Sequence, residues 1–132
     1  MRFMLLQNYG RIEGVGPMSE WTPEEIQAHI TFQRRINAEL TERGELIDAQ
    51  ALTGPEAAKL VTYGGTGDPV VTDGPFAEYK ELLAGYRIID VESLERAIEV
   101  AARVSSAPGP NAAPLKQPIE LREVMAPLGP AS

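Results

Sequence analysis

The sequence predicts an α+β protein built on a split βαβ sheet with two helices on one face. The first observation is the order of segments, which is strand, helix, strand, hairpin strand, strand, helix, strand. The second is that two segments carry apolar side chains at helical spacing, while the others suit short strands. The third is length: 132 residues fit a single domain with a modest core. We expect this domain to cover residues 1–126, with residues 127–132 forming a flexible C-terminal tail.

Six short segments are predicted to be strands or the arms of a hairpin. The first, residues 2–9, begins with the continuous apolar run Phe3–Leu6, which suits a buried strand. The hairpin is expected around the loop Gly64–Asp68, where three glycines favour a turn. Together with the most apolar strand, residues 82–91, the remaining expected strands cover residues 45–52, 57–63, 70–72 and 119–125.

Two helices are expected from their start signals and spacing. The first begins at Thr22-Pro23-Glu24-Glu25, because threonine can cap, proline suits the first turn and the glutamate completes a capping box. It should end near Arg43, with Gly44 in the terminating position. The second begins at Asp90 or Ser93, and its apolar side chains follow helical spacing at Leu94, Ala97, Ile98, Ala101 and Val104. Four prolines after it predict an irregular loop.

The expected strand 82–91 is mainly apolar on both faces. Ala84, Tyr86 and Ile88 should point one way, and Gly85 and Ile89 the other. Because two helices cover only one face of such a sheet, the second face needs another cover. The sequence therefore predicts a homodimer.

Composition excludes several classes of function. The net charge of −7 opposes the basic surface of a nucleic-acid binder and argues against docking on anionic lipid, so neither partner is expected. The absence of cysteine excludes disulfides, thiolate metal sites and cysteine nucleophiles. One histidine with scattered carboxylates predicts no metal site, and no motif predicts a cofactor. With no signal pattern or membrane-spanning stretch, we expect a cytoplasmic protein.

One stretch also carries a family resemblance. Val71-Thr72-Asp73-Gly74-Pro75-Phe76-Ala77-Glu78, with Lys80-Glu81 and Gly85-Tyr86, resembles the signature of the DGPF-type, YCII-related proteins. Asp90–Leu94 and Pro118–Arg122 resemble that family's second-helix start and last strand. The resemblance implies a ferredoxin-like fold that dimerises into an α+β barrel. It implies little about activity, although DGPF-type proteins are associated with alternative sigma factors.

The Asp73-Gly74-Pro75-Phe76 turn has a full structural explanation. Asp73 can bond the backbone two residues on, Gly74 accepts unusual dihedral angles, and Pro75 fixes φ. The functional interpretation is that the turn aims Asp73, Glu78 and Lys80 at a cleft. Glu78 and Lys80 lie two apart, so they share a side of an extended segment and could hold a polar ligand or pair internally. Tyr86, at the end of the motif, is a further candidate ligand-binding residue.

The only histidine, His29, lies on the inward face of the first helix at four-residue spacing with Gln33 and Asn37. Three polar side chains on a core-facing stripe must either bond locally or line a wet pocket. In a pocket, His29 would be the natural acid or base. His29 also resembles the helical histidine of YciI-like proteins, where the suggested centre is a His–Asp pair. Those relatives carry the aspartate after the second helix, where this chain has Val104-Ser105-Ser106-Ala107-Pro108, so Asp73 would have to replace it.

Two hypotheses follow from these residues. In the first, the protein binds a small organic molecule in a pocket between the sheet and the first helix, with acid–base chemistry by His29 assisted by Asp73 or Glu78. The ligand-binding residues in this hypothesis are Gln33, Asn37, Glu78, Lys80 and Tyr86. In the second, it is a non-catalytic dimeric regulatory or interaction protein, for example one associated with sigma-factor control of transcription.

Overall fold

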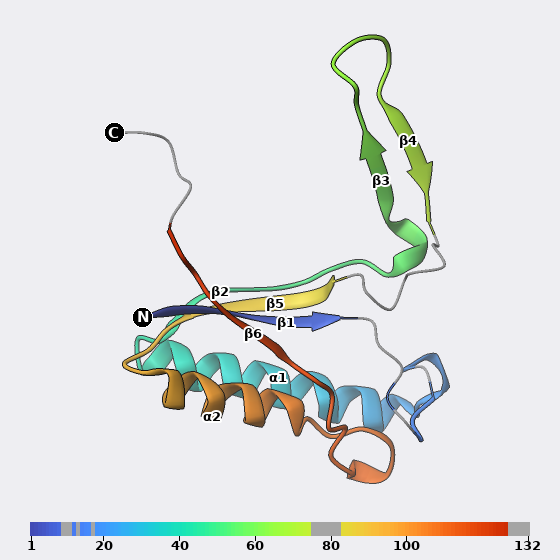
Figure 1. The fold of residues 1–132 in the computed structure, drawn as a ribbon. Helices are drawn as coiled ribbons and strands as arrows, with labels where there is room; N and C mark the ends of the chain where they lie inside the picture. Colours follow the sequence, from blue (N-terminus) through green and yellow to red (C-terminus); the bar gives the residue numbers. More distant parts are fainter. Residues whose placement is uncertain (9–11, 13, 17, 75–82, 127–132) are drawn as a thin grey trace.

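The sheet and its two helices form two layers. The computed structural model describes residues 1–8, 12, 14–16, 18–74 and 83–126. Within them, four antiparallel strands pair in the order β2-β5-β1-β6, and both helices lie on one face of this sheet (Figure 1). This arrangement is α+β and consistent with a ferredoxin-like fold, as the sequence predicted. A two-stranded hairpin, β3–β4, is inserted between β2 and β5 and stands on the sheet face opposite the helices.

The elements follow the predicted order, with their ends shifted by a few residues. The bounds are β1 Arg2–Asn8, η1 Met18–Glu20, α1 Pro23–Glu42, β2 Leu46–Ala51, η2 Pro55–Ala57, β3 Lys59–Thr62, β4 Val70–Asp73, β5 Leu83–Asp90, α2 Leu94–Ser105, η4 Pro110–Ala112 and β6 Glu120–Glu123. Ser93, one of the two residues expected to cap α2, accepts the backbone N–H of Arg96. The turn residues Pro75 and Phe76 and the expected tail, residues 127–132, lie outside the described residues.

Helix α1 begins and ends where its sequence signals predict. Thr22 accepts the N–H of Glu25, and the Glu25 carboxylate accepts the N–H of Thr22, which completes the capping box. The following Gly44 has φ +72°, a left-handed conformation that favours glycine, and the chain turns there into β2. The sequence therefore fixes both the length of α1 and the point where its last turn meets the sheet.

The core lies between the helices and one face of the sheet. Its buried members come from β1, the end of β5, the turn that follows β5 and both helices: Phe3, Leu5, Ile36, Leu40, Ile89, Val91, Ala97, Val100 and Val104. Gly85 of β5 is buried as well, and a Cβ there would lie 3.0 Å from the Gln50 backbone oxygen. Glycine thus allows the close approach of β2 to β5.

The face of β5 that meets the helices is mainly apolar, as predicted, with one charged exception that the prediction did not include. Arg87 lies on that face, between Gly85 and Ile89, and is only 5% exposed. The opposite face agrees better with the prediction, because Tyr86 and Ile88 pair with apolar residues of β1 there. Met4 lies opposite Ile88, and Leu6 opposite Tyr86. The part of the chain that the structure describes leaves this outer face without a layer of helices (Figure 1).

Candidate functional site

His29 lies at the centre of a chain of polar contacts in the N-terminal half of α1. Its Nδ1 is 3.1 Å from the Pro108 carbonyl oxygen, and its Nε2 is 3.4 Å from Gln33 Nε2. The ring also meets Trp21 edge to face, with centroids 5.7 Å apart. His29 itself is half-buried. The polar stripe predicted on α1 is therefore hydrogen-bonded locally.

Arg87 of β5 completes this network from the sheet side. Its Nε donates to Asn37 Oδ1 at 2.7 Å, and its Nη2 donates to Gln33 Oε1 at 2.6 Å and to the Gln33 backbone oxygen at 3.3 Å. Gln33 and Asn37 lie one helical turn apart, so a single planar guanidinium reaches both. The space between sheet and α1 at this level is thus filled by an arginine and two amides.

The two ends of the network fix the direction of every hydrogen bond in it. A guanidinium can only donate, and a carbonyl oxygen can only accept. Because Arg87 donates to Gln33 Oε1, the Gln33 amide nitrogen faces His29 and donates to Nε2. His29 Nδ1–H then donates to the Pro108 carbonyl. The geometry assigns the neutral Nδ1–H tautomer to His29, with Nε2 as an acceptor.

Arg87 is a buried cation whose hydrogen-bond acceptors are neutral oxygens. Desolvation by burial lowers the pKa of its guanidinium to about 10. A carboxylate partner would oppose that shift, but the bonds of Arg87 in the described residues go to amide and backbone oxygens. A shift of this size corresponds to a cost on the order of 3 kcal/mol at neutral pH. The position is expensive for stability, which is typical of functional sites.

The loop after α2 holds the Pro108 carbonyl against His29. The Glu25 carboxylate, already part of the capping box, also accepts the backbone N–H of Asn111 at 2.6 Å. These bonds, first that from the Thr22 backbone and then that from Asn111, hold the pKa of Glu25 below its ordinary value. Leu115 N–H donates to the Ala107 oxygen, which closes the loop on itself. The start of α1 thereby positions a loop that lies far along the chain.

A shallow, open groove of about 720 Å³ runs along α1 beside this network. It lies between the outer side of the helix and the loop after α2. Pro108, whose carbonyl contacts His29, forms part of its wall, as does Ala28. Its lining combines apolar with charged and polar side chains: Pro23, Glu24, Gln27, Ala28, Thr31, Phe32, Arg35 and Pro108. This is a different place from the space between sheet and α1 that the sequence suggested.

Tyr86 and the helix network lie on opposite faces of the sheet. Tyr86 donates its hydroxyl to Asp48 Oδ2 at 2.9 Å on the outer face. That hydrogen bond raises the pKa of the phenol, with burial adding to the effect. Gln50 donates to the other oxygen of the same carboxylate at 3.0 Å. Within one chain, Tyr86 is therefore not brought together with His29, Gln33 and Asn37.

Asp73 lies in a third place, at the base of the hairpin. Its carboxylate pairs with Lys59 across β3 and β4, and it is 74% exposed. The described contacts of His29 are with Trp21, Gln33 and Pro108, so a single chain does not show the predicted pairing of His29 with Asp73. Glu78 and Lys80, the other candidates near the motif, lie outside the described residues.

Sequence reasoning missed Arg87 and Pro108. Arg87 gave a signal, because it is the one charge among apolar neighbours in the run Leu83–Ile89. Pro108 acts through its backbone oxygen, which no side-chain pattern can show. It follows the segment Val104–Ala107, where the family resemblance led us to look for an aspartate. The ring of His29 thus contacts a neutral carbonyl oxygen there. This oxygen can orient the ring but stabilises a protonated imidazolium less than a carboxylate would.

Comparison with known proteins shows to which family the chain belongs. A family model described as the YCII-related domain matches residues 1–109, most of the chain. The chain belongs to the YCII-related family. An uncharacterized protein of Rhizobium meliloti (strain 1021) is similar to this YCII-related chain, with 34% identity over 89 residues. The aligned part covers 67% of this chain and 71% of that protein. The resemblance inferred from the Asp73 motif is confirmed.

Two further observations bear on cofactors and membranes. Among the described residues, no three His, Cys, Asp or Glu side chains gather in a way that could hold a metal ion. No helix in the same residues has the length and apolarity needed to cross a membrane.

Proposed function

We propose that this YCII-related protein binds a small organic molecule in the groove along α1, with His29 as an acid–base group at its edge. The observation that carries the proposal is the buried, neutral-partnered Arg87, connected through Gln33 to a histidine that meets the groove wall at Pro108. A structural role alone would favour an apolar residue at position 87, since burying a cation without a counter-charge costs stability.

The groove suits a ligand with an apolar body and polar ends. Its volume falls within the range of small-molecule sites, about 300–1,000 Å³. Phe32 and Pro108 offer apolar surface, while Arg35 and Glu24 provide opposite charges at different levels of the same helix face. A ligand with an anionic group would find its partner at the Arg35 guanidinium.

His29 is prepared to accept a proton at Nε2. Its Nδ1–H is held by the Pro108 carbonyl, and the bond that Nε2 accepts from Gln33 is long, at 3.4 Å. A ligand that approached Nε2 would need to displace this weak bond only. The oriented Nδ1–H would keep the ring in place while Nε2 gained or lost a proton. Assistance by Asp73, which the sequence suggested, remains a proposal, because Asp73 is not among the described contacts of His29 within one chain.

We also propose that two copies form an α+β barrel through their outer sheet faces. The support is the apolar strip of Met4, Leu6, Tyr86 and Ile88, which the described helices leave uncovered. Both copies would carry the same strip, as a two-fold interface requires. The Tyr86–Asp48 pair would then lie inside the barrel. A monomer by light scattering at micromolar concentration would end this part of the proposal.

The groove is tested by filling it. Ala28 is exposed and lines the groove, so Ala28→Phe should block it without entering the core. In a thermal-shift screen of small organic acids, a ligand at 100 times its Kd should stabilise the wild-type protein by about 2.7 kcal/mol. Ala28→Phe should abolish that shift. The matched control is Ala38→Phe, a change at an exposed alanine of α1 outside the groove lining, which should keep it.

The outcomes separate binding from catalysis. If Ala38→Phe and Ala28→Phe lose the shift equally, the ligand site is elsewhere. If His29→Gln keeps the shift but loses turnover of the ligand found, His29 performs acid–base chemistry. If no member of the panel shifts the wild-type protein, the proposal of a small-molecule site fails, and the regulatory alternative is the one to pursue by recovery of protein partners from the native host.

A further inference from the structure

The hairpin β3–β4 presents an unusual surface. Every residue of both strands is exposed, yet large apolar side chains predominate. The exposed fractions are Leu60 51%, Val61 62%, Tyr63 59%, Val70 61% and Val71 54%. Together they present on the order of 500 Å² of apolar surface, close to the largest patch of a typical monomer, which is about 300–600 Å².

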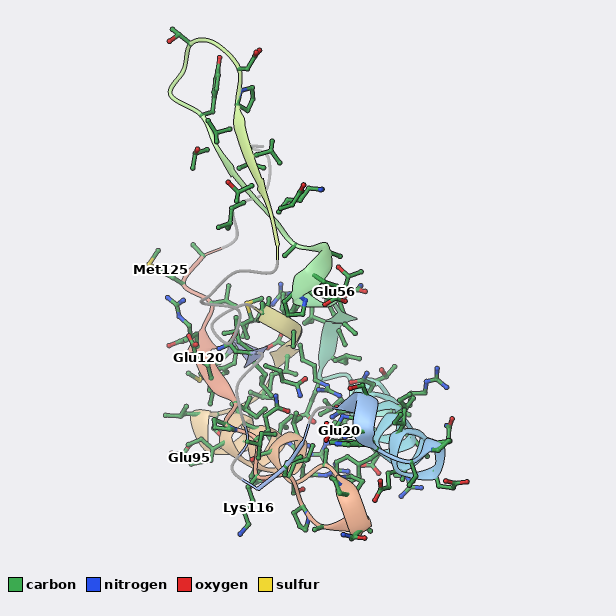
Figure 2. All side chains as sticks on the ribbon, turned by 90° about the vertical axis from the view of Figure 1, so that its right-hand side faces the viewer. Glu20, Glu56, Glu95, Lys116, Glu120 and Met125 are labelled. Atoms are coloured by element: carbon green, nitrogen blue, oxygen red, sulfur yellow. The ribbon has the colours of Figure 1, made fainter. Side chains whose placement is uncertain are left out.

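This apolar surface covers both faces of the hairpin. In the register of the two strands, Val61 lies opposite Val71 on one face. Leu60 lies opposite Thr72, and Val70 opposite Thr62, on the other. Figure 2 shows side chains leaving the hairpin on both sides, well away from the helices, with Glu56 at its base. A two-stranded hairpin is marginally stable by itself, so one with apolar faces exposed on both sides needs a cover.

The charges of the hairpin indicate what kind of partner covers it. The ion pair of Lys59 with Asp73 closes its base, and the strand residues beyond that pair carry no charge. Exposed strand edges in monomers are usually protected by charged side chains, and in the strands of this hairpin the only charges are the Lys59–Asp73 pair at the base. An uncharged surface offers nothing to nucleic acid or to a charged peptide. Two copies that each carry a net charge of −7 repel each other, and an uncharged apolar surface is where they can meet.

We infer that the hairpin β3–β4 is an arm that packs against a second copy of this chain. The inference rests on the barrel dimer proposed above and extends it. The hairpin rises on the same side of the sheet as the outer face (Figure 1). A second copy that docks on that face by a two-fold axis therefore lies next to the hairpin of the first copy. By symmetry, the hairpin of each copy contacts its partner. Two arms add their area to that of the sheet faces, toward the roughly 1,200–2,000 Å² of stable interfaces.

The arm is tested by placing charge on it and measuring dimer dissociation. Val61→Glu with Val71→Glu charges one face, and Leu60→Glu with Val70→Glu charges the other. By analytical ultracentrifugation, at least one of these double variants should raise the Kd of the dimer about 100-fold or more. The matched control is Ile98→Glu on α2, where the wild-type side chain is 52% exposed but lies in the helix layer. That variant should change the Kd by less than about threefold.

A second measurement locates the contact without weakening it. The chain has no cysteine, so Tyr63→Cys gives a single attachment point for a thiol-directed photo-crosslinker. In a mixture of ¹⁴N- and ¹⁵N-labelled copies, mass spectrometry should find mixed-isotope crosslinks. Ile98→Cys, treated in the same way, should give none.

The outcomes distinguish the arm from the proposals on which it rests. One outcome is that the wild-type protein is a dimer, that neither double variant changes its Kd, and that Tyr63→Cys gives crosslinks within one copy only. In that case the arm is wrong and the barrel stands. If the wild-type protein is a monomer, both the arm and the barrel are wrong, while ligand binding in the α1 groove is unaffected. Far-UV circular dichroism of each double variant should match that of the wild-type protein, because the hairpin contributes no buried residue to the core of one chain.

Discussion

Two arginines of this protein are held in opposite ways. Arg96 of α2 donates to both carboxylate oxygens of Glu45, with its Nη2 2.9 Å from Oε1 and its Nε 3.1 Å from Oε2. That hydrogen bonding raises the pKa of Arg96 and lowers the pKa of Glu45. Arg87 of β5 donates to two amides and a backbone oxygen, and burial lowers its pKa. Among the residues that the structure describes, one cation has its counter-charge beside it, and the other has only neutral acceptors.

The difference separates an ion pair that joins two helices from a buried cation whose described acceptors are neutral. Glu45 lies just after the turn at Gly44, and Arg43 also pairs with it, so the carboxylate joins the end of α1 to α2. This is an arrangement that favours folding. The Arg87 site costs stability instead, and its hydrogen bonds orient His29 through Gln33. Arg96 therefore stabilises the fold, whereas Arg87 orients a polar network at a cost in stability.

The largest expected effect comes from removing the counter-charge of Arg96. Glu45→Gln keeps the size of the side chain but removes the buried carboxylate from a guanidinium that is only 15% exposed, leaving it the exposed Glu99 as its ion-pair partner among the described residues. We expect the free energy of unfolding at pH 7 to fall by about 3 kcal/mol, measured by urea denaturation. Glu99→Gln is the matched control. Glu99 pairs with the same arginine but is 68% exposed, so its loss should cost less than about 0.5 kcal/mol.

The same pair of variants gives a pH dependence with a defined sign. The pKa of Glu45 is lowered in the folded state, so its stabilisation is fully present above its unfolded value of 4.5. The stabilisation is lost as pH falls through the folded pKa. The difference between wild type and Glu45→Gln should therefore shrink below pH 4.5. A difference that stays constant from pH 7 to pH 3 would contradict the assigned ion pair.

A smaller effect is expected from placing a counter-charge next to Arg87, whose acceptors in the described part of the chain are neutral. Gln33→Glu places a carboxylate where Gln33 Oε1 now lies, 2.6 Å from Arg87 Nη2. Offsetting the buried charge should raise the free energy of unfolding by about 1–2 kcal/mol at pH 7. Gln27→Glu adds the same charge to an exposed position of α1 and should change stability by less than about 0.5 kcal/mol. A lower free energy of unfolding for Gln33→Glu would show that a carboxylate at this position does not stabilise the buried charge of Arg87.

The smallest effect concerns the orientation of His29. Imidazole ¹⁵N NMR of the neutral wild-type ring should show the Nδ1–H tautomer, since Nδ1 donates to Pro108 and Nε2 accepts from Gln33. In Arg87→Met, Gln33 loses the donor that fixes its amide, so we expect a mixture of tautomers and a change of well under 1 kcal/mol in that equilibrium. The Nε2–H tautomer in the wild-type protein would contradict the direction of the network.

Local signals were sufficient for the elements and for the family. The capping box at Thr22, the left-handed Gly44 and the Ser93 cap depend on neighbours within a few residues, so the sequence predicted where α1 and α2 begin and where α1 ends. The Asp73 motif identified the YCII-related family for a similar reason, because it is a contiguous string of residues. The α+β order of segments also followed from local patterns alone.

The tertiary structure decided which polar groups meet. His29 and Gln33 could be placed on one stripe from helical spacing, but their partners Pro108 and Arg87 lie 79 and 54 residues away along the chain. Which residues cross from a strand or a loop to that stripe depends on the register of β5 and on the loop held by Glu25, and periodicity carries neither. The sequence by itself determined the elements and the candidate histidine. Packing determined that a backbone oxygen and a buried arginine contact its polar stripe, because long-range contacts are set by the whole fold.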